Sequence, residues 1–144
     1  MKANLSKRAP MVLHRDILKR NTLVYLVVAP KPIRRKNGRS RIAYIGTTQK
    51  GVSRMALSAA FRAQEVFDRK SFQKLEVCVV SSKGRPGRIA WWKILERALL
   101  AKFFERYHEF PLCNRKGARN WKSGWSRFIR EDRMRKIVGQ FDAS

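Results

Sequence analysis

The chain has 144 residues, 44% of them hydrophobic, which is enough to form one domain with a modest apolar core. It carries 34 Lys and Arg against 10 Asp and Glu, and a formal net charge of +24 predicts a polyanionic partner, with nucleic acid favoured over anionic lipid. No apolar run is long enough to span a membrane and the N-terminus lacks an apolar signal core, so we expect a cytoplasmic protein that is not secreted.

The chain begins with a basic arm over residues 1–20, in which a short helix is expected around residues 13–19. The β-branched run TLVYLVVA then predicts a strand. Two prolines interrupt this pattern in PKPIRRKNGRSR, where an Asn-Gly pair suits the tip of a hairpin, and IAYIGTT predicts the second strand. The tip contains cations that we expect to contact a phosphate backbone: Lys31, Arg34, Arg35, Lys36, Arg39 and Arg41.

The pattern becomes helical after Gly51, where VSRMALSAAFRAQEVF predicts a helix. KLEVCVV at residues 74–80 predicts a third strand. IAWWKILERALLAKFFERYHEF predicts a helix of roughly five turns, ended by Pro111. A basic loop and a last helix in SRFIREDRMRKIVGQF complete the chain. This order is typical of a small α+β domain, with a three-stranded, mainly antiparallel sheet flanked by helices.

Several kinds of active site have no signal in the sequence. The only two histidines, His14 and His108, are far apart, so a histidine-rich metal site is not expected. GTTQKG lacks the spacing of a phosphate-binding loop, and no pattern indicates a serine or cysteine nucleophile. Cys78 and Cys113 match no zinc or redox spacing, so we expect two free thiols.

Glu96 is a rare acid beside the apolar face of the long helix, where a carboxylate is costly unless it is paired or bound to metal. An ion pair with Lys93 or Arg97 is one interpretation. The other is a single-carboxylate ligand for Mg²⁺ or Mn²⁺, because these ions accept few protein oxygens together with water and phosphate.

Five elements follow one another along the chain: LVY at 23–25, YIG at 44–46, Arg54, Glu96 on the long helix, and Asn114 after FPLC. In this order they resemble the GIY-YIG nuclease family. The resemblance implies a GIY-YIG-like nuclease core over residues 21–116, with the basic loop and C-terminal helix of residues 117–144 packed on it in a single domain. It implies a metal-dependent DNA endonuclease that uses one Mg²⁺ or Mn²⁺ ion and leaves 5′-phosphate and 3′-hydroxyl ends.

The resemblance also implies a role for each matched residue. Tyr25 would be the base that helps deprotonate water, with its phenolate favoured by the surrounding cations. Tyr44 would hold the attacking water or the phosphate, and Arg54 would stabilise the charge that grows on the phosphate. Glu96 would bind the metal ion, and Asn114 would complete the pocket by hydrogen bonding. We therefore expect both phenols on one side of the hairpin, facing Arg54 and Glu96.

Some positions depart from the family pattern or leave alternatives open. Leu23-Val24 replaces Gly-Ile, and Ser58 stands where many members have a histidine. Gly46 would let the backbone turn tightly beside the phosphate. Arg62, two turns beyond Arg54, is a rival for the catalytic arginine.

Further cations are expected to contact DNA, with a duplex favoured as its form: Lys50, Arg62, Arg115, Lys116, Arg119 and Lys122. Trp121 and Trp125 could stack on an unpaired base or dock the last helix. A homodimer would allow cleavage of both strands. The alternative function is that of a non-catalytic basic nucleic-acid-binding protein of ribosomal or chromatin-like type.

Overall fold

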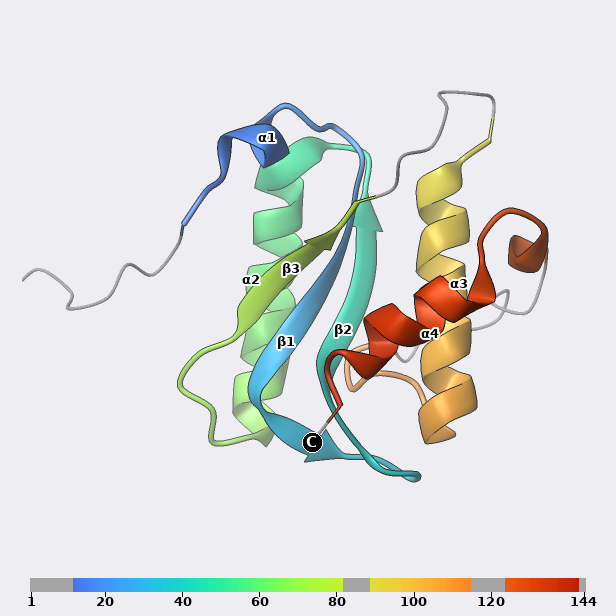
Figure 1. Ribbon diagram of the computed structural model, residues 1–144. Helices are drawn as coiled ribbons and strands as arrows, with labels where there is room; N and C mark the ends of the chain where they lie inside the picture. Colours follow the sequence, from blue (N-terminus) through green and yellow to red (C-terminus); the bar gives the residue numbers. More distant parts are fainter. Residues whose placement is uncertain (1–11, 82–88, 115–123, 143–144) are drawn as a thin grey trace, which may run out of the picture.

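A computed structural model describes residues 12–81, 89–114 and 124–142 of the chain. The elements run in the order α1 (Arg15–Leu18), β1 (Leu23–Arg34), β2 (Arg39–Thr48), α2 (Gly51–Arg69), β3 (Glu76–Val80), α3 (Trp91–Tyr107), a 3₁₀ turn η2 (Trp125–Arg127) and α4 (Glu131–Gly139). The three strands form one antiparallel sheet in the order β2-β1-β3 (Figure 1). The structure thus confirms the α+β prediction of a three-stranded antiparallel sheet flanked by helices.

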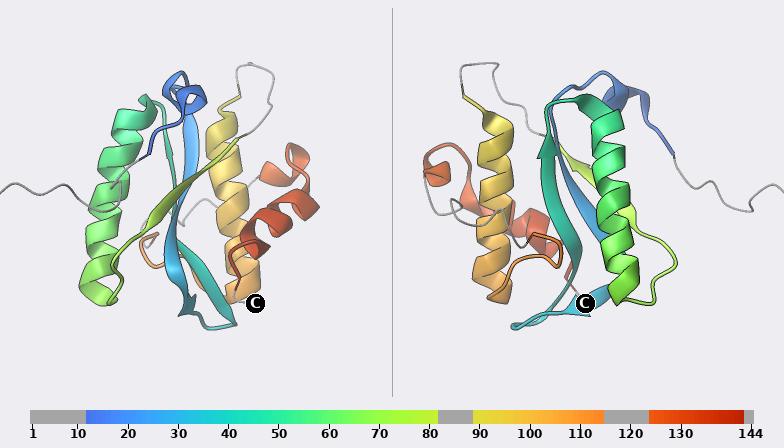
Figure 2. Two further views of the ribbon diagram at one scale, coloured as in Figure 1. Left: turned by 60° about the vertical axis from the view of Figure 1, so that its left-hand side comes forward. Right: turned by 180° about the vertical axis from the view of Figure 1, so that it is seen from behind.

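The central strand β1 is covered on both faces, which explains why apolar and polar residues do not alternate along its sequence. Val24 and Leu26 pack in the main core, together with residues of α3 and α4. Leu23, Tyr25 and Val27 point the other way, into a smaller cluster with residues of α2. Figure 2 shows α2 on one side of the sheet, α3 and α4 on the other, and the edge strand β2 between α2 and α3.

The hairpin tip is shorter than the sequence predicts. β1 continues through Pro30 and Pro32, where the pairing with β2 shifts register. A proline has no N–H to donate. Because the pairing is already irregular here, the two prolines cost the sheet few hydrogen bonds. The turn itself closes when the Arg35 N–H donates to the Gly38 carbonyl at 3.0 Å, and Gly38 takes a positive φ of 78°.

Two other expectations can be compared with the described residues. Cys78 and Cys113 are both free thiols, as expected. Among the helices of the described ranges, none is both long enough and apolar enough to cross a membrane.

Candidate active site

Tyr25 and Tyr44 lie on the same face of the hairpin. Tyr25 pairs with Gly46 and Val27 pairs with Tyr44, and because side chains alternate along a strand these four share one face. The two rings are 5.9 Å apart between centroids and inclined by 53°. The expectation that both phenols point to one side is therefore confirmed. That side is covered by α2, which carries Arg54, whereas α3, which carries Glu96, covers the other face of the sheet (Figure 2).

Gly46 serves the tyrosine pair in a different way from the one expected. It lies within β2 and is not among the glycines with a positive φ, so it makes no tight turn. The ring of Tyr44 instead lies across it, and a Cβ added at Gly46 would stand 2.8 Å from Cζ of that ring. The glycine of the YIG motif thus leaves the space in which the Tyr44 ring lies.

Replacement of Gly46 by Ala is expected to displace the Tyr44 ring and to lower the free energy of unfolding by about 1 to 3 kcal/mol, as overpacking does. Urea unfolding measures this loss. The matched control is Gly139→Ala, where the nearest atom outside the helix backbone is a side-chain oxygen at 3.8 Å and the change should be neutral or stabilising. Equal stability of the two variants would contradict this account of Gly46.

Tyr25 is only 1% exposed, and its hydroxyl donates to Oγ of Ser58 on α2 at 2.8 Å. Burial is the main cause that raises the pKa of Tyr25 to about 12. The Ser58 hydroxyl, which could turn to donate to a phenolate, acts to lower this pKa, and the nearby Tyr44 and Glu96 add smaller increases. The expected phenolate is therefore wrong for this structure, because desolvation outweighs the attraction of the surrounding cations. Near pH 7 the Tyr25 side chain is a neutral phenol.

This pKa predicts a loss of stability in alkali. The folded-state pKa of Tyr25, about 12, exceeds the ordinary value of 10.0, so its stabilising contribution is complete below pH 10 and is lost as the pH rises towards 12. At 1.36 kcal/mol per pKa unit, the loss amounts to about 2 to 3 kcal/mol. The wild type should lose this amount of unfolding free energy relative to Tyr25→Phe between pH 9 and pH 12. A difference between the two proteins that is the same at both pH values would contradict the raised pKa of Tyr25.

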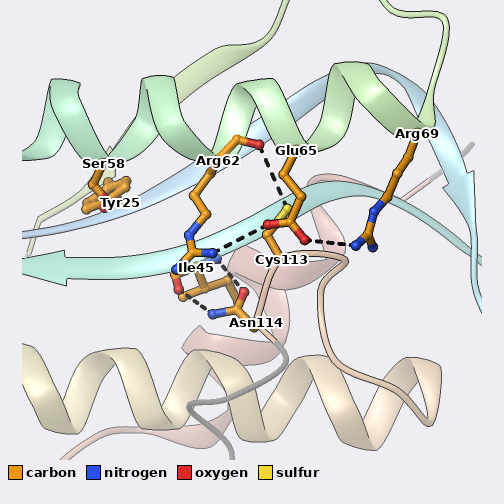
Figure 3. A network of polar contacts seen from close by, with 8 residues as sticks. All are labelled: Tyr25, Ile45, Ser58, Arg62, Glu65, Arg69, Cys113 and Asn114. Atoms are coloured by element: carbon orange, nitrogen blue, oxygen red, sulfur yellow. Dashed lines mark hydrogen bonds and ion pairs between the residues drawn. The ribbon is translucent and has the colours of Figure 1, made fainter.

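Asn114 closes the outer edge of β2. Its side-chain oxygen accepts the Ile45 N–H at 2.9 Å and its amide donates to the Ile45 carbonyl at 2.7 Å, so one side chain imitates a neighbouring strand (Figure 3). The Cys113 N–H donates to the Ala43 carbonyl at 3.1 Å beside it. The segment after α3 is thereby fixed against the strand that carries Tyr44.

Arg62, the rival arginine, is the one that contacts the tyrosine pair. Its guanidinium carbon lies 4.9 Å from the centre of the Tyr44 ring and 5.5 Å from that of Phe61. Nη1 is 3.4 Å from Glu65, which also pairs with Arg69 at 3.1 Å. The Arg62 Nε–H is buried and has no hydrogen-bond partner within the described part of the chain. The Arg62 side chain as a whole is 31% exposed, so another part of its guanidinium remains open to an incoming anion.

Arg54, by contrast, lies on the exposed surface of α2 near its start. In the ranges that the structure describes, the Arg54 side chain forms neither a hydrogen bond nor an ion pair. The geometry thus places Arg62 rather than Arg54 against Tyr44, while Arg54 stays free to bind a ligand from solvent.

Glu96 is partly buried on α3. Burial raises the pKa of Glu96 to about 7, although the neighbouring Arg97 and Lys93 act to lower it. Neither of them forms an ion pair with Glu96, and within the described ranges this carboxylate has no hydrogen-bond or ion-pair partner. The ion-pair interpretation is therefore not supported by the structure.

A partly buried carboxylate without a partner fits a site for one divalent cation, because a cation would offset the cost of its burial. The described residues contain no group of three or more His, Cys, Asp or Glu side chains that could hold a metal. A site built here would therefore depend on the single Glu96 carboxylate, with the remaining ligands supplied by water and phosphate.

Apart from Arg62, the expected DNA contacts divide into four groups. Arg35 is wrong as a contact residue: it is 6% exposed, donates to the Ile42 carbonyl at 2.6 Å and lies 3.5 Å from Glu109, so it holds the hairpin to the body. Arg41 is partly engaged, by the Ala29 carbonyl at 2.8 Å. The exposed cations of the set are Lys31, Arg34, Lys36, Arg39 and Lys50. Those outside the described residues are Arg115, Lys116, Arg119 and Lys122.

The two ambiguous tryptophans also separate. Trp125 is 6% exposed and packs in the main core, with Nζ of Lys102 5.2 Å from the centre of its ring. It therefore docks the segment that leads to α4, and base stacking is excluded for it in this conformation. Trp121 lies outside the described residues.

Comparison with known proteins gave no match: no family model, no curated protein and no solved structure is significantly similar to the chain. The resemblance to GIY-YIG nucleases therefore depends on the motif residues in the sequence.

Proposed function

We propose that the protein is a metal-dependent DNA endonuclease of GIY-YIG type, which hydrolyses phosphodiester bonds to leave 5′-phosphate and 3′-hydroxyl ends. The observation that carries this proposal is the unpaired carboxylate of Glu96, partly buried in a chain with 34 Lys and Arg. A protein that only binds nucleic acid has no use for a desolvated acid without a partner, since it costs stability and repels phosphate.

The residues around the tyrosine pair then take distinct parts. Arg62 would bind the scissile phosphate through the exposed part of its guanidinium and stabilise the charge that develops there. Tyr44 is partly exposed and would contact the attacking water or a phosphate oxygen, whereas Tyr25 is buried beneath it. Asn114 would keep β2, and with it Tyr44, in place.

Glu96 is the residue that would hold a bound Mg²⁺ or Mn²⁺ ion. Such an ion would neutralise charge on the phosphate and on the departing 3′-oxygen. The exposed cations of the hairpin and the net charge of +24 would position a DNA duplex largely through its phosphates. The two free thiols suit the reducing cytoplasm, and a homodimer would bring one site to each strand.

Supercoiled plasmid incubated with the wild-type protein tests this function. We expect conversion to nicked and linear forms with Mg²⁺ or Mn²⁺, no conversion in excess EDTA, and cut ends that a ligase rejoins because they carry 5′-phosphate and 3′-hydroxyl groups. Retardation of the plasmid without any cutting, across both metals, would instead support the non-catalytic nucleic-acid-binding protein.

A further inference from the structure

Three polar side chains form one stripe along α2: Arg54, Ser58 and Arg62, each four residues from the next. Residues at this spacing are neighbours on a helix surface. Arg54 is exposed, and Arg62 reaches the Tyr44 ring on the β2 edge. Ser58 is half-buried between them, directly above Tyr25, as Figure 3 shows. In the sequence, Ser58 stood out only as a departure from the family pattern. Its four-residue spacing from both arginines is the signal that could have placed it on the same helix face.

The hydrogen bond from Tyr25 determines what the Ser58 hydroxyl can do. A phenol is a stronger donor than an aliphatic hydroxyl, so the Tyr25 O–H donates and Ser58 Oγ accepts, at 2.8 Å. Within the described part of the chain this is the sole hydrogen bond of the Ser58 side chain. Its own O–H therefore remains to be donated, away from Tyr25, and the side chains one turn to either side are arginines.

We propose that Ser58 donates a hydrogen bond to a phosphate oxygen of the nucleic acid, between Arg54 and Arg62, and that Tyr25 acts through Ser58 by orienting its hydroxyl. This inference rests on the proposed function and assigns a further phosphate ligand to the same site. Ser58 would be a binding residue that touches the substrate, and Tyr25 a positioning residue. The 1% exposure of Tyr25 agrees with this division, because in this conformation a water molecule could not reach its ring.

Plasmid nicking by Ser58 variants tests the proposal. Ser58→Ala is expected to lower kcat/KM by roughly 10- to 100-fold, the value of one hydrogen bond to a charged group, and a few-fold of this loss should be a rise in KM. Ser58→Thr, which keeps the hydroxyl, should retain activity within a few-fold of wild type. Ser53→Ala removes an exposed hydroxyl from the same helix and serves as the matched control. If Ser58→Ala cuts as fast as Ser53→Ala, the proposal is overturned while the nuclease function stands.

A double-mutant cycle separates action through Ser58 from a direct role of Tyr25. If Tyr25 acts by orienting Ser58, then Tyr25→Phe slows nicking in the wild type and adds little once Ser58 is Ala. Fully additive losses would show that Tyr25 works independently of Ser58 and would overturn its assignment as a positioning residue. Thermal unfolding of each variant shows whether a loss of rate reflects a loss of fold.

If the wild type never nicks DNA, the proposed nuclease function is refuted, but the role of Ser58 in phosphate binding is not. A DNA-binding measurement then tests that role. Fluorescence anisotropy with a labelled short duplex, without divalent metal and at fixed salt, should show roughly 3- to 10-fold weaker binding for Ser58→Ala but not for Ser58→Thr or Ser53→Ala. If the protein does not cut DNA and Ser58→Ala binds it as tightly as the wild type, Ser58 does not contact a phosphate, and this inference is refuted too.

Discussion

The Glu96→Gln variant is expected to bind DNA as the wild type does and to lose metal-dependent nicking by about 100-fold or more, since the ion that it would no longer hold supplies several kcal/mol of charge stabilisation. Glutamine has nearly the same shape but carries no charge, so the substitution removes the attraction for a cation and leaves the packing of α3 in place. Paramagnetic resonance of Mn²⁺ titrated into the two proteins with DNA present should show weaker binding by the variant.

Stability provides the control for this variant. The folded-state pKa of Glu96, about 7, lies above the ordinary value of 4.5, so the folded state prefers the protonated side chain and loses that advantage as the pH rises from 4.5 to 7. At pH 8 the unfolding free energy of Glu96→Gln should therefore equal or exceed that of the wild type, with an excess of up to about 3 kcal/mol. Nicking at the wild-type rate, or a variant that unfolds more easily at pH 8, would contradict the account of Glu96.

The second large effect is expected at Arg62. Arg62→Ala should lower the nicking rate by roughly 100- to 1000-fold, the usual cost of removing a donor that stabilises developing negative charge. Arg54→Ala should cost at least tenfold less, because Arg54 is exposed and does not contact the tyrosine pair. Arg62→Lys should recover little, since an ammonium group cannot reproduce the planar fork of donors.

Arg69→Ala is the matched control, because Arg69 also pairs with Glu65 but lies two turns further along α2. It should leave the nicking rate unchanged, which would show that the effect at Arg62 does not come from disturbing Glu65. If Arg54→Ala proved more damaging than Arg62→Ala, the arginine first matched to the family motif would be the catalytic one and the assignment from geometry would fail.

Much of the fold follows from local patterns in the sequence. The β-branched run around Tyr25 and the Asn-Gly pair predicted the hairpin, and the alternation of side chains placed Tyr25 and Tyr44 on one face. The extension of β1 through Pro30 and Pro32 could not be predicted in the same way. It depends on a register shift opposite β2, and no single-strand pattern records such a shift.

The candidate site was less accessible to sequence reasoning, because burial decides its chemistry. A count of charges suggested a phenolate at Tyr25, yet the environment of the ring is dominated by desolvation. Arg35 looked like another cation of the hairpin tip, but the tip folds back so that it meets Glu109 and the Phe103 ring, 5.3 Å from its guanidinium carbon. The pairing of Asn114 with Ile45 joins residues 69 positions apart and leaves no trace in either local sequence.

The measurement that tests the central claim most directly is a time course of supercoiled plasmid nicking in Mg²⁺, with wild type and Glu96→Gln compared at concentrations that retard the DNA equally. The account predicts that the wild type nicks the plasmid and that Glu96→Gln binds it but leaves it supercoiled. Equal nicking by the two proteins, or none by either, would contradict the claim that the unpaired carboxylate on α3 belongs to a phosphodiesterase site.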